Sequence, residues 1–241
     1  MDAAEHDRRE FFERTLTGGA AALALGVLPA ATAADDPAAA KGAKRIRVGV
    51  IGCGSVSGRY LPHLSSCPYA EIVSTCDIIS ERAVGRAREF KVPHHYPHIS
   101  KMLAGEPFDL LVNLTDMQEH EHLNREAIAA GKHIWSEKPI ANTLEAGQAI
   151  LEQAKQKGVR VWGAPVVVSS PQFAFMARTI ASGALGRLAS AHADYGHTGP
   201  DWSSFFYDEG GGSMPDLGVY NLTSLTGLLG PAKAVVAMTS V

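Results

Sequence analysis

Cysteine and aromatic side chains are scarce in this sequence, and neither sign of charge dominates it. The 241 residues include three cysteines, Cys53, Cys67 and Cys76, and 7% are aromatic. An odd number of cysteines at these spacings fits neither a zinc site nor a disulfide framework, so no metal site is expected. The net charge of −3 provides no basic surface for a nucleic-acid partner. Hydrophobic residues make up 46% of the chain, which is enough to bury a core.

Long apolar runs are also missing, apart from one short stretch near the N-terminus. The weakly apolar segment Leu16–Leu28 is shorter than the roughly 20 residues that a membrane span needs. It follows the pair Arg8 and Arg9 and precedes a small-residue cleavage site, the pattern of a twin-arginine export signal. We therefore expect residues 1–33 to be a signal peptide, residues 34–44 a linker, and the protein periplasmic or otherwise extracytoplasmic. The alternative is an Ala-rich leader with an Arg pair by chance.

From Arg45 onward, strand and helix patterns alternate, which is typical of a parallel sheet with crossover helices. The predicted strands are Arg45–Ile51, Glu71–Asp77, His94–Tyr96, Asp109–Thr115, His133–Glu137 and Val159–Gly163. The predicted helices are Gly58–Ser66, Ser80–Phe90, Ile99–Ala104, Glu119–Ala130, which Gly131 ends, and one that begins near the capping-box-like residues 142–145 and runs to Lys157. This order predicts an α/β fold with a Rossmann dinucleotide-binding domain over residues 45–163.

The remaining residues, 164–241, show a different pattern of predicted helices and strands. Helices are expected at Pro171–Ser182 and from Met214 to Leu229, and strands at Arg187–Tyr195 and Ala232–Val241. Together they predict part of an α/β open-sheet substrate domain. Because the last apolar segment would be an unpaired strand, a truncated fragment stays open as an interpretation.

A glycine turn follows the first predicted strand. Gly52 and Gly54 let the backbone turn tightly and let a pyrophosphate approach the next helix, and Ser55 and Val56 complete the turn. We expect these four residues to contact a dinucleotide; the alternative is a plain tight turn.

The second predicted strand ends at Asp77. A carboxylate there accepts hydrogen bonds from a ribose 2′-hydroxyl and repels a 2′-phosphate, which favours NAD. Arg82, one turn into the next helix, keeps NADP open. The alternative for Asp77 is a helix N-cap.

Two later strands end with polar residues at the edge where open α/β sheets bind ligands. Asn113 and Thr115 end one strand, and His120 follows it, either beside the nicotinamide or as a solvated helix residue. Glu137 and Lys138 end the next strand. A lysine there can hold the developing negative charge of a substrate oxygen; the alternative is a surface lysine in a turn.

The run HLNREAIAAGKHIWSEKPIANTLEAG, with the glycine turn before it, resembles the Gfo/Idh/MocA oxidoreductases. The resemblance covers roughly Lys44 to Val241 and implies that Lys138 is the catalytic lysine of a nicotinamide-dependent enzyme acting on sugars, cyclitols or related alcohols. The family usually has Asp-x-Gly-x-His on a later helix. Here the motif carries Asp216 and Tyr220, as in the glucose–fructose oxidoreductase and dihydrodiol dehydrogenase branches.

Asp216 and Tyr220 lie four residues apart and share one helix face. Tyr220 is expected to exchange a proton with the reacting oxygen and Asp216 to steady Lys138 or bind substrate; the alternatives are a core tyrosine and an N-terminal cap. Nearby, His197 and Trp202 are candidate substrate contacts.

The combined expectation is hydride transfer between an NAD cofactor, with NADP possible, and a small carbohydrate-like alcohol. The redox direction, the substrate and whether the protein is a homo-oligomer are left open. Two alternatives remain: an exported glycosidase that retains NAD, and a truncated nucleotide-binding protein without turnover.

The export signal yields a direct test. Replacing the pair by lysines, Arg8→Lys with Arg9→Lys, keeps the charge but removes the twin-arginine motif, so export should be blocked. Cell fractionation measures this, and undiminished export of the double variant would rule out the route.

Overall fold

The computed structural model describes residues 44–201 and 203–238. The predicted signal peptide (1–33), nearly all of the predicted linker and Trp202 lie outside the described residues. None of the described helices is both long and apolar enough to cross a bilayer.

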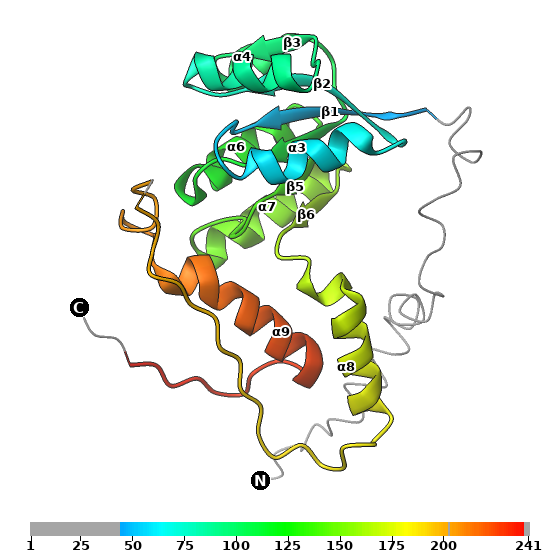
Figure 1. Cartoon of the computed structure of the whole chain (residues 1–241), viewed down its shortest axis with the longest axis vertical. Helices are drawn as coiled ribbons and strands as arrows, with labels where there is room; N and C mark the ends of the chain where they lie inside the picture. The colour runs from blue at the N-terminus through cyan, green and yellow to red at the C-terminus, as the bar shows by residue number, and fades with distance from the viewer. Residues whose placement is uncertain (1–43, 202, 239–241) are drawn as a thin grey trace.

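One sheet of six parallel strands forms the first part of the chain, at the top of Figure 1. Its strands are β1 (Ile46–Ile51), β2 (Ala70–Cys76), β3 (His94–Tyr96), β4 (Leu110–Asn113), β5 (His133–Ser136) and β6 (Val161–Gly163). They are arranged in the order β3-β2-β1-β4-β5-β6. The α/β Rossmann fold predicted from the alternating pattern is therefore confirmed.

The helices that connect these strands also match the predicted ones. They are α3 (Ser57–Ser66), α4 (Ser80–Glu89), α5 (Ile99–Leu103), α6 (His120–Ala129), after the 3-10 turn η3 (Met117–Glu119), and α7 (Leu144–Lys157). Thr143 begins α7 because its hydroxyl accepts a hydrogen bond from the amide of Ala146 at 3.1 Å. Gly131, with a φ of 73°, follows the end of α6 as a glycine can without strain.

Two apolar clusters hold the sheet between its helices. One joins Val48, Val50 and Val112 to Leu61 of α3. The other is larger and joins strand residues such as Leu111 and Ile134 to the helices α5, α6 and α7, through residues that include Met102, Ile128 and Ile150. Burial on both sides explains why the central strands are continuous apolar runs.

The chain reverses its direction across the sheet between β1 and β4, because β4 pairs with β1 on the side opposite β2. The carboxyl ends of these two strands therefore lie side by side, the place where open α/β sheets leave a crevice. Gly52 follows β1 with a φ of 87°, and a side chain there would lie 2.5 Å from the carbonyl carbon of Leu114. Only glycine fits this close approach.

The second part of the chain is helical among the described residues. It contains the 3-10 turn η4 (Val167–Ser169), α8 (Pro171–Ala181), a π-helix (Met214–Gly218) and α9 (Val219–Leu229), with α8 packed against α9 (Figure 1). Ser170 caps α8 by accepting from the amide of Phe173 at 3.1 Å. Both predicted helices are confirmed.

The two strands predicted in this part are not found. Residues 187–195 and the described residues 232–238 are extended but belong to no sheet. A strand is stable only when a neighbouring strand accepts and donates its backbone hydrogen bonds, and no described segment lies beside these two as a partner. Both segments have the apolar pattern of strands, but among the described residues no strand pairs with either of them.

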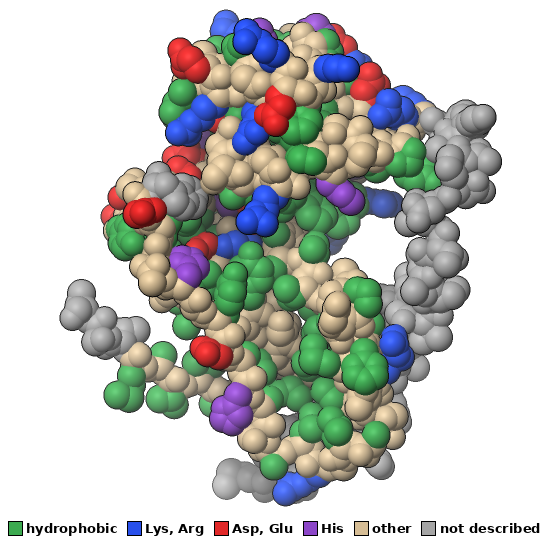
Figure 2. Space-filling view, viewed as in Figure 1, with side chains coloured by type: hydrophobic (Ala, Val, Ile, Leu, Met, Phe, Trp, Pro, Cys, Tyr) green, Lys and Arg blue, Asp and Glu red, His purple; other side chains and the backbone are tan. Residues whose placement is uncertain are grey.

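Apolar side chains are unevenly exposed. Figure 2 shows charged side chains crowded over the sheet domain and hydrophobic ones gathered over α8 and α9. Those exposed there include Phe175, Met176, Leu222 and Leu229.

The close approach at Gly52 predicts that any side chain at this position would strongly destabilise the fold. In Gly52→Ala, the alanine would have to adopt a φ of 87°, which it rarely does, and its Cβ would clash with backbone atoms. The free energy of unfolding should therefore fall by at least about 1–3 kcal/mol. The matched control is Gly85→Ala in exposed mid-α4, where an added Cβ meets nothing within 4 Å. That variant should gain up to about 1 kcal/mol. Urea denaturation measures both, and equal midpoints would contradict the argument.

Candidate active site

Two cavities open at the carboxyl edge of the sheet, on either side of the glycine turn. The first has a volume of about 590 Å³ and reaches toward the C-terminal helices. The second, of about 360 Å³, lies over the ends of β2 and β3. Five residues line both: Gly54, Arg82, Leu114, Thr115 and Asp116. The cavities thus form two halves of one crevice at the reversal point of the sheet, which suits an elongated ligand with two ends.

The glycine turn is held from α4. Ser57, the first residue of α3, donates to the carbonyl of Gly54 at 2.6 Å. Arg86 donates to the hydroxyl of Ser57 at 3.0 Å and to the same carbonyl at 3.3 Å. Of the predicted turn residues, Gly52 lines the second cavity, Ser55 and Val56 line the first, and Gly54 lines both. The turn therefore presents a fixed backbone at the start of a helix, where phosphates bind.

Asp77 holds the glycine turn and faces the second cavity, but it is not the N-cap of α4, which is Ile79. Its carboxylate accepts hydrogen bonds from the amides of Cys53 and Ile79, each at 2.8 Å, and thereby ties the glycine turn to the start of α4. It also lines the second cavity. A carboxylate has about four acceptor sites, so two remain for a ribose hydroxyl. The pocket thus fits the adenosine half of a dinucleotide.

Basic side chains line the crevice where a pyrophosphate would cross the turn. Arg82 lines both cavities, and Arg59 and Arg86 line the first. Asp116 lies among them, and burial raises the pKa of its carboxyl. Arg82 and Arg86 lie four residues apart and therefore share one face of α4. Only Arg82 was considered from the sequence, although this spacing also indicated Arg86.

Asn113 does not line either cavity. It is fully buried and its side-chain oxygen accepts from the hydroxyl of Thr115 at 2.7 Å, while its amide donates to Asn124 at 3.0 Å. The side chain of Asn113 therefore points into the domain rather than into the crevice, away from the place expected for a cofactor contact. Thr115, which it holds, lines both cavities.

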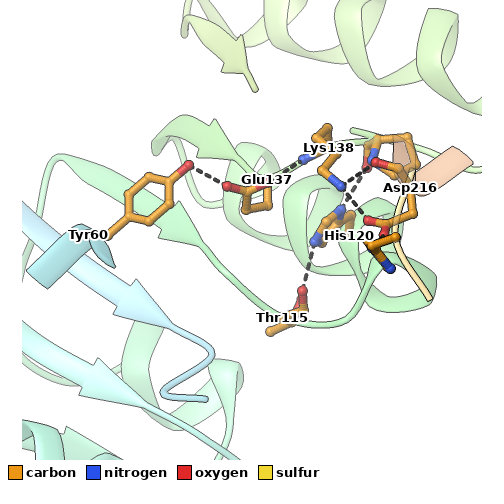
Figure 3. A network of polar contacts seen from close by, with 8 residues as sticks. Tyr60, Thr115, His120, Glu137, Lys138 and Asp216 are labelled. Atoms are coloured by element: carbon orange, nitrogen blue, oxygen red, sulfur yellow. Dashed lines mark hydrogen bonds and ion pairs between the residues drawn. The ribbon is translucent and has the colours of Figure 1, made fainter. Parts of the chain in front are cut away.

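Lys138 lines the first cavity, with its side chain 11% exposed. Its ammonium forms an ion pair with the carboxylate of Asp216 and donates to the carbonyl of the same residue at 2.6 Å (Figure 3). It also lies 5.1 Å from the centre of the Tyr220 ring, within the range of a cation–π contact. These contacts bring together the three residues predicted to be catalytic.

Asp216 belongs to the π-helix Met214–Gly218 and is buried. Ser213 makes no side-chain capping bond, and the Asp216 carboxylate faces Lys138, so the capping interpretation is not supported. His197 lies on the other side of Asp216, with Nε2 3.7 Å from the carboxylate. His197 does not line either cavity, so among the described residues it contacts Asp216 rather than the crevice.

Glu137 is bonded to Tyr60 and to the backbone of Lys138 rather than to the Lys138 ammonium. Its carboxylate accepts a hydrogen bond from the hydroxyl of Tyr60 on α3 and another from the backbone amide of Lys138 at 3.1 Å (Figure 3). Burial raises the pKa of the Tyr60 phenol, so Tyr60 stays a donor. Both residues line the first cavity. Tyr60 was not singled out from the sequence, because nothing local to α3 indicates a partner 77 residues away.

Tyr220 keeps its hydroxyl uncommitted within the described part of the chain. The ring packs edge-on against Tyr195, with centroids 5.3 Å apart, and lines the first cavity. Burial, with Glu137 and Tyr195 nearby, raises the pKa of Tyr220 to about 12. The phenol therefore carries its proton throughout the neutral range and can donate it.

His120 is buried rather than solvated. Its Nδ1 lies 2.6 Å from the carbonyl of Pro139 and its Nε2 lies 2.9 Å from the carbonyl of Thr115. Burial lowers its pKa. The ring lines the first cavity, but both nitrogens face backbone oxygens, so neither is free to contact a nicotinamide.

Comparison with known proteins follows the same division of the chain. A family profile described as "Oxidoreductase family, NAD-binding Rossmann fold" (GFO_IDH_MocA) matches residues 46–164, and one described as "GFO/IDH/MocA C-terminal domain" matches residues 173–241. The first agrees with the predicted dinucleotide cofactor and with the crevice described above.

Two curated relatives illustrate the degree of similarity. The dTDP-3,4-didehydro-2,6-dideoxy-alpha-D-glucose 3-reductase of Actinomadura kijaniata is 27% identical, over 78% of this chain and 57% of the relative. The trans-1,2-dihydrobenzene-1,2-diol dehydrogenase of Mus musculus is 24% identical, over 78% of this chain and 57% of the relative. The chain thus spans little more than half the length of these relatives.

Solved structures share the fold. KijD10, a 3-ketoreductase from Actinomadura kijaniata in complex with NADP and TDP-benzene, matches with a TM-score of 0.73 and 25% identity, over 78% of this chain and 58% of that one. The aldose-aldose oxidoreductase from Caulobacter crescentus complexed with glycerol matches with a TM-score of 0.71 and 22% identity, over the same shares of the two chains.

Proposed function

This chain belongs to the Gfo/Idh/MocA family of oxidoreductases, and from that premise we propose that it carries out NAD(P)-dependent hydride transfer to or from an alcohol carbon. The observation that carries the proposal is the position of Lys138. A nearly buried ammonium, paired with Asp216 and stacked on Tyr220, lines the cavity that continues into the dinucleotide crevice.

The residues of this chain would divide the work as follows. Bound NAD(P) supplies or accepts the hydride. Ser55, Val56 and Thr115 would contact the cofactor along the crevice, with Asp77 at the ribose of its adenosine half. Lys138 would donate a hydrogen bond to the substrate oxygen and stabilise the negative charge that develops on it. Asp216 fixes the ammonium in place for that role.

Tyr220 would exchange the proton with the same oxygen. Its raised pKa keeps the phenol protonated at neutral pH, so it is ready to donate when a carbonyl is reduced. In the oxidative direction the phenol would first release its proton to solvent, which the adjacent positive charge of Lys138 favours, and the resulting phenolate would then take the alcohol proton.

Sugars, cyclitols or related alcohols are the proposed substrates. Support comes from the names of two similar proteins, a reductase of a dTDP-linked keto-sugar and an aldose-aldose oxidoreductase. The Asp216-x-x-x-Tyr220 motif supports placing the chain near the glucose–fructose oxidoreductase and dihydrodiol dehydrogenase branches. The Arg8–Arg9 pair supports export of the folded enzyme.

The cofactor preference tests the role of Asp77. NAD should bind more tightly than NADP, because a 2′-phosphate would meet the Asp77 carboxylate. Asp77→Asn keeps an acceptor for the turn and removes the charge, so the preference should narrow by about tenfold, or roughly 1.4 kcal/mol. Asp77→Ala should narrow it as well, and should also weaken both cofactors because the amides of Cys53 and Ile79 lose their acceptor. Calorimetric titration measures the affinities; NADP binding at least as tight as NAD to the unmutated chain would defeat the claim.

The chemistry is tested by two substitutions. Lys138→Ala should reduce turnover by on the order of 10²–10³. Tyr220→Phe keeps the ring and removes the hydroxyl, and should cost roughly 10²–10⁴. Because both groups serve one oxygen, the double variant should lose less than the product of the two. Cofactor affinity should change only a few fold.

The measurement is single-turnover hydride transfer with saturating cofactor, on the first sugar or cyclitol that the protein turns over. The controls are Lys155→Ala on α7 and Tyr207→Phe, both exposed and outside the cavities, which should keep the parent rate. If Tyr220→Phe also keeps the parent rate, the tyrosine is a packing residue and the proton must travel elsewhere.

A further inference from the structure

Helix α6 buries two polar side chains against the segment that carries Lys138. His120 is 1% exposed and Asn124 is 0% exposed. They lie four residues apart, so they share one face of the helix. Polar groups buried to this degree are retained where their hydrogen bonds fix a particular arrangement of the backbone.

Asn124 ties the strand before Lys138 to the segment after it. Its amide donates to the hydroxyl of Ser136, the last residue of β5, at 3.0 Å and to the carbonyl of Ile140 at 3.3 Å. Its oxygen accepts from Asn113 at the end of β4. One side chain thus connects both ends of the Lys138 segment to the neighbouring strand.

His120 adds a bond next to the catalytic lysine itself. Nδ1 reaches the carbonyl of Pro139, the residue after Lys138, and Nε2 reaches the carbonyl of Thr115 at the crevice (Figure 3). A neutral imidazole carries one proton and can donate to only one of the two. The contact to Pro139, at 2.6 Å, is shorter than the contact to Thr115, at 2.9 Å, and it is the one adjacent to Lys138.

We propose that His120, through an Nδ1–H bond to the carbonyl of Pro139, is a positioning residue that sets the place of the Lys138 ammonium relative to the crevice. Asn124 supports the same segment from the next turn of α6. The inference rests on the proposed role of Lys138, and it assigns His120 a function other than the cofactor contact expected from its position in the sequence.

Two substitutions separate the two ring nitrogens. The side-chain amide of asparagine places a donor close to where Nδ1 of histidine lies, whereas that of glutamine reaches the position of Nε2. His120→Asn should therefore keep the bond to Pro139, and His120→Gln should lose it. His63→Gln, exposed on α3 and outside both cavities, is the matched control. A role in packing alone gives no reason for asparagine to substitute better than the longer glutamine.

The readout is Lys138 itself and needs no substrate. In protein with ¹³C-labelled lysine, the side-chain Cε signal of Lys138 is assigned by its loss in Lys138→Ala. His120→Gln should shift this signal, while His120→Asn and His63→Gln should leave it near that of the parent. Unchanged Lys138 signals in all folded variants, or equal changes in the asparagine and glutamine variants, would overturn the proposal.

A second measurement covers the case in which a buried variant does not fold. The ¹⁵N shifts of the His120 ring in the unmutated protein report which nitrogen carries the proton; an Nδ1–H ring supports the proposal and an Nε2–H ring overturns it. Once a substrate is known, His120→Gln should slow single-turnover hydride transfer by about 10–10²-fold, since small misplacements of catalytic groups cost that much, with cofactor affinity unchanged. If Lys138→Ala proves fully active, the proposed function fails, yet the signals of Lys138 still test the positioning.

Discussion

The ion pair between Lys138 and Asp216 is the interaction on which the rest of the site depends. It joins a lysine at the end of β5 to a carboxylate 78 residues later, in the helical second part of the chain. Both side chains are nearly buried, so neither charge is stable there without the other. Both residues line the first cavity, the ammonium lies beside the Tyr220 ring, and the Glu137 carboxylate bonds Tyr60 instead. In a site built this way, Lys138 is paired with Asp216, and Glu137 has a separate partner in Tyr60.

Most of the sheet domain could be predicted from local patterns in the sequence. Each strand of the Rossmann domain is an apolar run bounded by a turn, and each helix begins and ends near a residue with a recognisable reason, such as Thr143 and Gly131. The carboxyl ends of parallel strands share one edge, so Asp77, Thr115 and Lys138 were placed near one another without knowledge of their contacts. The four-residue spacing of Asp216 and Tyr220 likewise put both side chains on one helix face.

The differences from the expected structure have a common physical origin, because each depends on tertiary packing rather than on a local sequence pattern. Residues 187–195 and 232–238 have the composition of strands, but a strand also needs a neighbour, and composition does not supply one. Asn113 and His120 lie at the expected edge, yet their side chains turn inward to satisfy Asn124 and two backbone carbonyls. Tyr60 bonds Glu137 across the sheet edge, a contact that no spacing within α3 indicates. The strand end at which a residue lies can be predicted from the local sequence. The direction of its polar side chain cannot, because that depends on partners throughout the core.

The π-helix at Met214–Gly218 makes this site sensitive to the number of residues in that turn. An α-helix advances about 100° per residue, so two residues four apart are offset by roughly 40°. The wider π turn rotates less per residue and brings Asp216 and Tyr220 closer to eclipsed, both toward Lys138. Removing one residue from the turn would restore ordinary winding and swing Asp216 around the helix axis without changing a single side chain of the site. The spacing of this motif is therefore as much a part of the chemistry as its residues, and insertions or deletions are a harsher change here than most substitutions.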